Sequence, residues 1–425
     1  MGWVLVVLPF ALLALGVPIY LIFVATTITI LVGFLEVPPT IIPQVIFGSV
    51  DSFTLLAVPF FIFAGELMGR GGIATRLVQW FMAMFGRVRG SLALVTVASC
   101  ELFGTMSGSS PATVAAIGRL MYPALRERGY EEPFALGLVT ATGAIATVIP
   151  PSIMMILYAA SAEQSVAKLF LGGFLPGILI GLLMAVYILI YARRTLRPLG
   201  GTAKFTWAGF GKATWNAVFA LGVPLVILGG IYSGIFTPTE AAGIAGIYGI
   251  VVSRVVYRDL DWRGIWQIAV NSGLVTAQLM IIVAGSALFS WILTIQGIPQ
   301  QAAAFIESLQ MPQWGVLLAL NLFLIVVGCL VDPASAILVL TPLLAPIAQA
   351  VKVDLVHFGI ILTVNLSMGM FTPPFGLNIF LAQALFGAPT AKIYQGLIPF
   401  IVIQLIALMV ITHVPELSLL LPQLF

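Results

Sequence analysis

The chain has 425 residues, 61% of them hydrophobic and only 8% charged, and its mean hydropathy is +1.14. This composition excludes an ordinary soluble protein and indicates an all-α polytopic membrane protein. The formal net charge of +3 comes mostly from Lys and Arg in short loops, which orient a membrane protein and give no reason to expect nucleic-acid binding. The two cysteines, Cys100 and Cys329, lie in apolar runs and only two histidines are present, which argues against a disulfide or a transition-metal site.

The first apolar stretch predicts retained membrane helices. No small-residue cleavage site interrupts it, so we interpret it as spanning sequence rather than a signal peptide. Residues 3–35 are too long for one span and contain a Gly-Val-Pro triplet at 16–18, which predicts two helices or a kinked pair. Residues 41–51 are expected near the interface, and 52–68 form the next span. Residues 73–85 carry an apolar stripe at helical spacing, which predicts an amphipathic helix along the membrane surface.

A polar segment, Gly-Thr-Met-Ser-Gly-Ser-Ser-Pro at residues 104–111, interrupts the apolar run that follows. Its legs, 90–103 and 111–125, hold 14 and 15 residues, and at about 1.5 Å per residue neither crosses a core of about 30 Å. Both ends are marked by arginines: Arg87, Arg89, Arg126 and Arg128. Both ends are therefore expected in the cytoplasm, which predicts a re-entrant helical hairpin at 90–125. Tight packing through small residues is the alternative interpretation of its tip.

The middle of the chain predicts a broken helix, a span and a linker. Residues 134–159 would form one span, but Pro150 and Pro151 remove two backbone donors and break it. Another span is expected at 168–192. The longest hydrophilic connection, residues 193–212, is expected in the cytoplasm and separates two halves of the chain.

The second half repeats this order of elements. Its predicted segments are spans at 214–232 and 238–256, an interfacial stretch at 262–271, a span at 274–294, short legs at 313–331 and 334–350, a broken helix at 358–386 and a last span at 396–413. The two legs flank Asp332 and Pro333, and the broken helix contains Pro373 and Pro374. Residues 237–240 have the spacing of a capping box, which we prefer to a chemical role there.

An offset of 223 residues superimposes landmarks of the two halves. The matched pairs are Pro150-Pro151 with Pro373-Pro374, Pro123 with Pro346, Thr140 with Thr363, Pro176 with Pro399, and Ser109-Ser110 with Asp332-Pro333. Residues 70–128 contain seven arginines, whereas 295–351 contain no basic residue. The positive-inside rule therefore predicts opposite orientations. The result is an inverted repeat in which two re-entrant hairpins meet two proline-broken helices, an arrangement typical of secondary transporters.

Unwound carbonyls and helix ends at these breaks predict sites for ions and substrate near mid-membrane. Hydroxyl and carbonyl oxygens suit sodium, which is expected as the coupling ion; no transition metal and no cofactor are expected. One sodium site would involve Gly104, Ser107, Ser109, Thr147 and Pro150. Its counterpart would involve Asp332, Ser335, Met370, Thr372 and Pro373. Because Asp332 precedes a proline it can equally be a helix N-cap, and capping and coordination stay open together.

Candidates for contact with the substrate are Ser110, Arg119, Thr142, Asn365 and Asn378. For the arginine the alternative is snorkelling toward the cytoplasmic face. Two further acids, at positions 66 and 101, are weaker candidates, since one could snorkel to an interface and the other could pair with an arginine. The sequence has no nucleotide-binding loop and no nucleophile spaced to work with a base, so ATP hydrolysis and an intramembrane enzyme are disfavoured.

Several motifs together resemble a known family over essentially the whole chain. They are GVP at 16–18, AVPFFIFAG at 57–65, SGSSPATVAAIG at 107–118, VIPPS at 148–152, TPTEAA at 237–242, VDP at 331–333 and FTPPFGLN at 371–378. In combination they resemble the large membrane subunit of tripartite ATP-independent periplasmic (TRAP) transporters. Departures from the usual pattern are Pro111 and the pair Cys100-Glu101, which leave the substrate and the flexibility of the hairpin open.

The resemblance implies a sodium-driven importer of an organic acid anion, such as a C4-dicarboxylate, a sialate or a related carboxylate, in the bacterial inner membrane. It also implies an elevator mechanism and two partners, a periplasmic substrate-binding protein and a small four-helix membrane subunit. We expect that subunit on a separate chain, because no further four-helix block follows the last predicted span. The alternative is a stand-alone anion carrier coupled to sodium, or to protons through Asp332 or Glu101. A channel fits two opposed hairpins less well than alternating access does.

Mapped onto this chain, the resemblance implies a moving transport domain and a fixed scaffold. The transport domain would comprise 90–192, with hairpin 90–125 and broken helix 134–159, and 312–413, with hairpin 312–350 and broken helix 358–386. The scaffold would comprise 1–89, including the arm helix at 73–85, and 193–311, including the cytoplasmic linker and a second arm near 264–274. Residues 414–425 would form a C-terminal tail.

Overall fold

The computed structural model describes residues 2–35, 37–86, 88–195 and 206–424, and every regular element in these ranges is helical. Seven described helices are long and apolar enough to cross a membrane, and the bent pair Ile41–Val50 and Thr54–Arg70 counts as an eighth span if taken together. The all-α fold is thus confirmed, and these helices agree with a polytopic membrane protein. Arg87 and residues 196–205, expected in the cytoplasm, lie outside the described ranges.

The first half of the chain contains ten α-helices and one 3-10 turn. They are α1 (Gly2–Ala14), α2 (Ile19–Phe34), α3 (Ile41–Val50), η1 (Thr54–Leu56), α4 (Ala57–Arg70), α5 (Ile73–Phe85), α6 (Ser91–Ser107), α7 (Ser110–Glu127), α8 (Glu132–Ile145), α9 (Ile153–Ala162) and α10 (Val166–Thr195).

The second half follows with ten α-helices and one π-helical turn. They are α11 (Trp207–Tyr232), α12 (Pro238–Val251), η2 (Val252–Val256), α13 (Trp262–Ile295), α14 (Ile298–Ser308), α15 (Gln313–Leu330), α16 (Pro333–Ala350), α17 (Leu355–Gly369), α18 (Leu377–Phe386), α19 (Thr390–His413) and α20 (Glu416–Leu424).

Local sequence signals set several of these boundaries. Gly16 and Gly72 separate consecutive helices with φ of 75° and 77°, a left-handed conformation that favours glycine. At the start of α12, the Thr237 hydroxyl accepts a hydrogen bond from the Glu240 amide, and the Glu240 carboxylate accepts one from the Thr237 amide. This capping box explains Glu240 without a chemical role.

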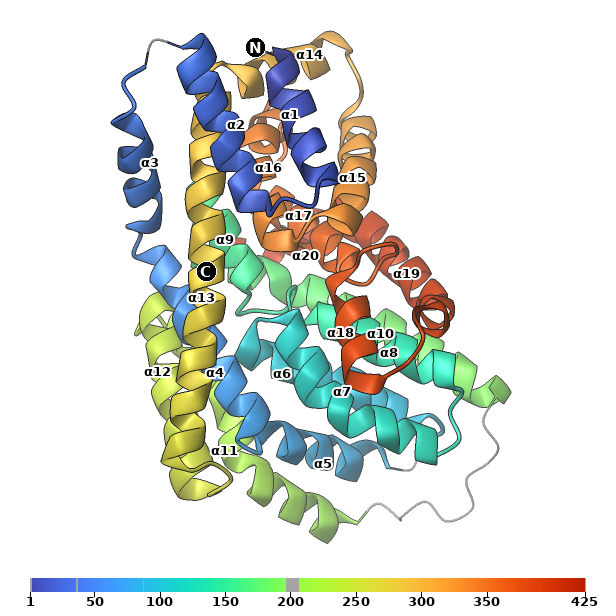
Figure 1. The fold of residues 1–425 in the computed structure, drawn as a ribbon. Helices are drawn as coiled ribbons and strands as arrows, with labels where there is room; N and C mark the ends of the chain where they lie inside the picture. Colours follow the sequence, from blue (N-terminus) through green and yellow to red (C-terminus); the bar gives the residue numbers. More distant parts are fainter. Residues whose placement is uncertain (1, 36, 87, 196–205, 425) are drawn as a thin grey trace.

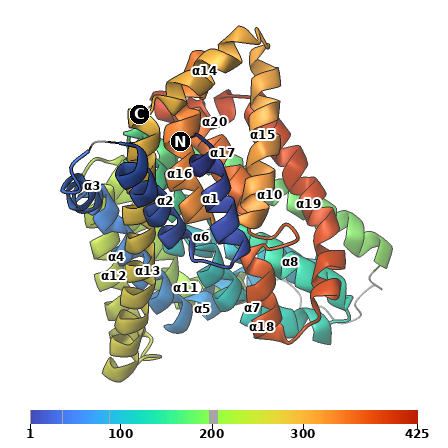
Figure 2. The same ribbon diagram turned by 45° about the horizontal axis from the view of Figure 1, so that its top comes forward.

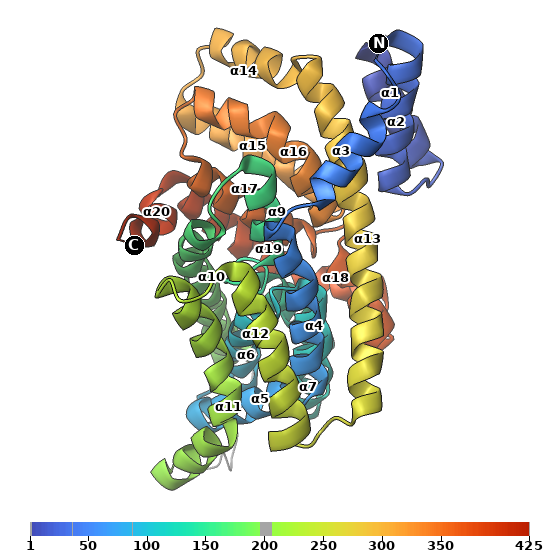
Figure 3. The same ribbon diagram turned by 90° about the vertical axis from the view of Figure 1, so that its left-hand side faces the viewer.

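The hairpin α6–α7 lies in the lower half of the molecule and the hairpin α15–α16 in the upper half, with the long helix α13 running past both (Figure 1). Short helices lie across the two ends, α5 at the lower edge and α14 at the upper edge. Turned views show α2 and α3 beside the upper part of α13, and α4 beside its lower part (Figures 2 and 3). One helix therefore contacts elements from both ends of the fold.

Two expected boundaries are wrong. The interfacial stretch 262–271, with the second arm near 264–274, does not exist as a separate element, because α13 is one continuous helix of 34 residues. No proline interrupts it, Asp261 caps its start, and it packs along its length against α2, α3, α4 and α16. Similarly, α11 begins at Trp207 inside the expected linker, where the Thr206 hydroxyl accepts a hydrogen bond from the Gly209 amide.

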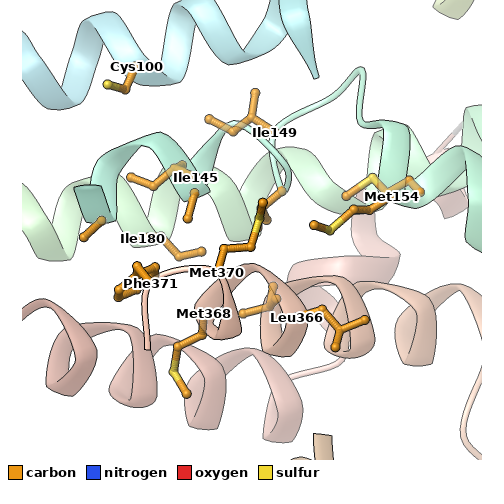
Figure 4. Close-up of a cluster of buried hydrophobic side chains, with 14 of the residues drawn as sticks. Cys100, Ile145, Ile149, Met154, Ile180, Leu366, Met368, Met370 and Phe371 are labelled. Atoms are coloured by element: carbon orange, nitrogen blue, oxygen red, sulfur yellow. The ribbon is translucent and has the colours of Figure 1, made fainter. Parts of the chain in front are cut away.

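Both double prolines lie in interruptions between helices. α8 ends at Ile145 and α9 begins at Ile153, while α17 ends at Gly369 and α18 begins at Leu377. The Pro150-Pro151 and Pro373-Pro374 peptide bonds are both cis. The Ser367 hydroxyl donates to the Ala144 carbonyl at 2.8 Å, so the two interruptions lie against each other. Figure 4 shows the apolar contact there, with Ile145 and Ile149 facing Met370 and Phe371.

Candidate functional site

A cavity of about 420 Å³ lies where the two hairpin tips approach each other. Hydroxyl-bearing and charged residues from both tips line it: Ser107, Ser109 and Ser110 from the first, and Asp332 from the second. The first interruption contributes Thr147, and the second contributes Met370. The remaining wall comes mainly from α4, α9, α13 and α18, and its polar members are Glu66 of α4 and Gln278 of α13. One largely apolar cavity, with a few polar groups, therefore receives both tips and both interruptions.

The first tip is a tight turn held against the first interruption. Gly108 has a φ of 57°, and a Cβ there would lie 2.5 Å from the Pro151 carbonyl oxygen, so the position requires glycine. The Gly108 carbonyl accepts a hydrogen bond from the Ile153 amide at 3.4 Å. The fully buried Ser107 hydroxyl lies 3.2 Å from the Thr113 hydroxyl. The tip is thus positioned by backbone contact, and the Ser107 hydroxyl already bonds to Thr113.

The other predicted residues of the first sodium site surround this turn. Gly104 packs so closely on the first interruption that a Cβ would lie 2.7 Å from Ala146 Cα. The Thr147 hydroxyl donates to the Ala144 carbonyl at 2.8 Å, and its own carbonyl accepts from the Ser152 hydroxyl. Pro150 is buried but does not line the cavity. Oxygen atoms of Ser107, Ser109 and Thr147 therefore come together.

The second tip is built around a carboxylate. Asp332 caps α16, because it accepts hydrogen bonds from the Ser335 amide at 3.0 Å and from the Ser335 hydroxyl. The capping interpretation is thus confirmed, and the same carboxylate also lines the cavity. The Met370 carbonyl accepts a hydrogen bond from the backbone amide of Asn378 at 2.8 Å. Ser335, Thr372 and Pro373 lie close by in the chain without lining the cavity.

The predicted substrate residues separate into different environments. Ser110 and Asn378 bond to each other, with the amide nitrogen 2.8 Å from the hydroxyl, which joins the first hairpin to α18. Thr142 is fully buried and donates to the Leu138 carbonyl. Asn365 donates to the Asn321 side chain at 2.8 Å. Of the five candidates only Ser110 lines this cavity, while Arg119 lines its neighbour.

The sequence alone missed three polar residues at or near the site. Ser152 follows the first double proline and bonds the carbonyl of Thr147, so its place in Pro-Pro-Ser was the available signal. Thr113, one turn into α7, bonds both Ser107 and the Ser109 carbonyl. Gln278 lies within the apolar helix α13, and nothing in its neighbourhood distinguishes it before folding.

The two weaker acidic candidates have different partners. Glu66 forms an ion pair with Arg70 at 3.1 Å. Glu101 has a buried carboxylate oxygen with no hydrogen-bond partner among the described residues, and it packs against Gly181 of α10. In the part of the chain that the structure describes, no three His, Cys, Asp or Glu side chains gather as a metal site.

A family model described as "Tripartite ATP-independent periplasmic transporter, DctM component" matches residues 6–417. The chain belongs to this TRAP transporter family. The C4-dicarboxylate TRAP transporter large permease protein DctM of Pseudomonas aeruginosa is 40% identical over 379 residues, which cover 89% of this chain and 88% of that protein. The resemblance to a TRAP large permease is thus confirmed, and relatives named as transporter permeases support a transporter rather than an enzyme.

Two further similarities concern a longer relative and a solved structure of similar fold. The isethionate TRAP transporter permease protein DctMQ of Oleidesulfovibrio alaskensis is 38% identical over 96% of this chain and 64% of that protein. The crystal structure of the YdaH transporter of Alcanivorax borkumensis has a TM-score of 0.62 at 16% identity, over 88% of this chain and 86% of that one. The latter shows likeness of fold alone. This chain is therefore a TRAP large permease by family, and its helices agree with a multi-pass membrane protein.

Proposed function

We propose that this chain is the large permease subunit of a sodium-coupled, binding-protein-dependent importer of an organic acid anion. The observation that carries the proposal is the single cavity in which the hydroxyls of one hairpin tip approach the carboxylate of the other. Membership of the TRAP family supports a transport role. Relatives named for C4-dicarboxylate and for isethionate support a small organic anion as the substrate.

Two sodium sites follow from the donor groups. At the first tip, oxygens of Ser107, Ser109 and Thr147 would hold one ion, with Gly104 and Pro150 shaping the backbone around it. At the second tip, Asp332 would hold the other ion together with carbonyls of Met370, Thr372 and Pro373, while Ser335 orients the carboxylate. Sodium binds oxygen ligands of this kind at unwound helices of other transporters.

The charge at the second tip offers a reason for coupling. Asp332 is the carboxylate that the second tip contributes to the cavity, and without a cation it would repel an anionic substrate there. A sodium ion beside Asp332 would remove that repulsion, so each ligand would favour binding of the other. The free amides at the start of α7 and the Ser110 hydroxyl are the groups best placed to receive the anion.

An inverted repeat and an elevator movement complete the proposal. The 223-residue offset relates Ala144 to Ser367, which bond each other at 2.8 Å. It also nearly relates the tight contact of Gly104 with Ala146 to that of Gly328 with Gly369. We propose that α6–α10 and α15–α19 move together as the transport domain against a scaffold of α1–α5 and α11–α14.

The proposed partners are a periplasmic substrate-binding protein and a small membrane subunit, in the bacterial inner membrane. The DctMQ relative is longer than this chain, so the small subunit can be a separate chain or fused in different systems. The lipid bilayer surrounds the apolar exterior of the complex.

The test is uptake by proteoliposomes that contain this chain, its small subunit and its binding protein. Labelled succinate and isethionate are offered with and without an inward sodium gradient. We expect accumulation of at least one anion only when sodium and binding protein are both present. Uptake that needs neither component would instead support a stand-alone carrier, and absence of uptake for a wider panel of carboxylates and sulfonates would refute the proposal.

A further inference from the structure

A second cavity of about 340 Å³ lies beside the first, between α4 and α7. Four residues line both cavities: Gly65, Glu66, Ala112 and Ala115. Because they share these walls, the two cavities are neighbouring parts of one cleft. The second part is also lined by Arg70 and Arg119, which do not line the first.

The spacing of residues on the two helices explains this lining. On α7, Ala112, Ala115 and Arg119 follow one another at three- and four-residue intervals, so they share one face. Glu66 and Arg70 are likewise one turn apart on α4. Near the tip the cleft is lined by alanine and glycine, which leave it open. Farther from the tip it is lined by the long charged side chains. Arg119 lies nine residues after Ser110, a distance of about 14 Å along the helix axis.

The charges in the second part of the cleft do not cancel. The Arg70 side chain pairs with Glu66 at 3.1 Å. The Arg119 side chain is exposed and has no ion pair with any residue in the described ranges. Two guanidinium groups against one carboxylate leave an excess of positive charge. Low-dielectric helices on either side of a cleft concentrate the field of such a charge.

We propose that Arg119, assisted by Arg70, forms an anion-attracting site through which a small organic anion leaves the cavity between the tips for the cytoplasm. The identity of the ligand as a transported organic anion rests on the proposed function above. The cytoplasmic side follows from the arginines around the first hairpin. Glu66 weakens the site by holding Arg70, so the anion passes through it instead of being retained.

The test measures the electrostatic potential of the cleft with a single reporter thiol. Cys100 and Cys329 are replaced by alanine in the full chain, and Ala115→Cys places one thiol in the wall that the two cavities share. In lipid nanodiscs, its rates of modification by anionic sulfonatoethyl methanethiosulfonate and by cationic trimethylammonioethyl methanethiosulfonate are compared. The ratio of the two rates reports the local potential and requires neither sodium, substrate nor binding protein.

We expect Arg119→Gln to lower the anionic-to-cationic rate ratio about fivefold, because one positive charge close to the thiol is removed. Arg119→Lys keeps the charge and should keep the ratio. Glu66→Gln removes a negative charge and should raise the ratio, which provides a test of opposite sign. Arg128→Gln is the matched control, since Arg128 is exposed on the same segment but 13 residues beyond the reporter.

A ratio that stays unchanged in Arg119→Gln, or that falls equally in Arg128→Gln, would overturn the inference. If Arg119→Gln does not fold, the outcome rests on Glu66→Gln, and an unchanged ratio in that variant is equally decisive against the site. If the native chain fails to take up anions although Arg119→Gln lowers the rate ratio, only the proposed function is contradicted. If the native chain takes up anions but Arg119→Gln leaves the rate ratio unchanged, only this inference is contradicted.

Discussion

The two hairpins reach the same cavity with different chemistry. The first tip presents the neutral hydroxyls of Ser107, Ser109 and Ser110, whereas the second presents the carboxylate of Asp332. Yet each hairpin meets its broken helix through a tight glycine contact. A Cβ at Gly104 of the first hairpin would lie 2.7 Å from Ala146 Cα, and a Cβ at Gly369 of the second broken helix would lie 2.3 Å from the Gly328 carbonyl oxygen. The comparison shows that backbone packing can stay the same while the polar groups that it positions change.

The support behind the two tips also differs. Behind the second hairpin, Asn321 of α15 accepts a hydrogen bond from Asn365 and donates one to Thr412 of α19 at 3.0 Å. In the first half, Thr142, which the 223-residue offset matches to Asn365, contacts the first hairpin through Cys100, whose sulfur lies 3.4 Å from the Thr142 hydroxyl. Directional amide bonds therefore link the body of the second hairpin to α17 and α19, whereas the contact at Thr142 behind the first hairpin is weaker.

The glycine contacts provide the largest expected effect. A Cβ at position 369 would lie 2.3 Å from the Gly328 carbonyl oxygen, and backbone atoms cannot move aside as a side chain can. We expect Gly369→Ala to destabilise the protein by about 3 kcal/mol, measured by thermal unfolding in nanodiscs. Gly104→Ala should behave similarly if the two hairpins pack alike.

Gly243→Ala is the matched control, because nothing lies within 4 Å of a Cβ at that position of α12. We expect it to be neutral or slightly stabilising, since alanine favours helices. If Gly369→Ala unfolded at the same temperature as Gly243→Ala, the close packing of the second hairpin would be wrong.

The charge difference between the tips gives the next effect. Asparagine is as good a helix N-cap as aspartate, so Asp332→Asn should leave the folded yield unchanged. If the carboxylate binds sodium, we expect the sodium concentration for half-maximal uptake to rise about tenfold, equivalent to a loss of about 1.4 kcal/mol. Ser109→Ala, at the neutral tip, should give a smaller rise. If Asp332→Asn left the sodium dependence of uptake unchanged, Asp332 would serve only as the N-cap of α16.

The polar support of the second hairpin predicts a moderate effect. Asn321→Leu removes partners from Asn365 and Thr412 inside the protein, so we expect a loss of about 1–2 kcal/mol in thermal stability. Cys100→Ala, which removes the weaker contact behind the first hairpin, should cost less. Equal losses in both variants would mean that the amide network adds no specific support.

The smallest effect concerns the ion pair that joins α8 to α19. Lys392 donates to Glu132 at 2.7 Å, and this hydrogen bond lowers the pKa of Glu132 below its ordinary value of 4.5. Both side chains are partly exposed, so Glu132→Gln should cost less than about 1 kcal/mol at neutral pH. A lowered folded-state pKa stabilises above pH 4.5 and loses that contribution as the pH falls further. The difference from the native chain should therefore shrink in acid, and a difference that grows in acid would contradict the assignment.

Much of the fold is predictable from local sequence. Apolar runs, the glycines at 16 and 72, the capping box at 237–240 and the double prolines act within a few residues, and the structure places helix ends at each of them. The helix at 73–85 has the predicted bounds. The prediction of a separate arm near 264–274 was wrong, because polar residues without a proline do not end a helix that is packed along its length.

The sequence by itself determined the membrane class and the family, because composition, motifs and backbone-breaking residues carry that information locally, and it predicted candidate residues for the site. Only the tertiary structure decided which of these residues meet. It pairs Ser110 with Asn378, ties Asn365 to Asn321, and brings Asp332 to the cavity of the first tip. Such contacts join residues far apart in the chain and depend on packing between helices, which no local pattern specifies.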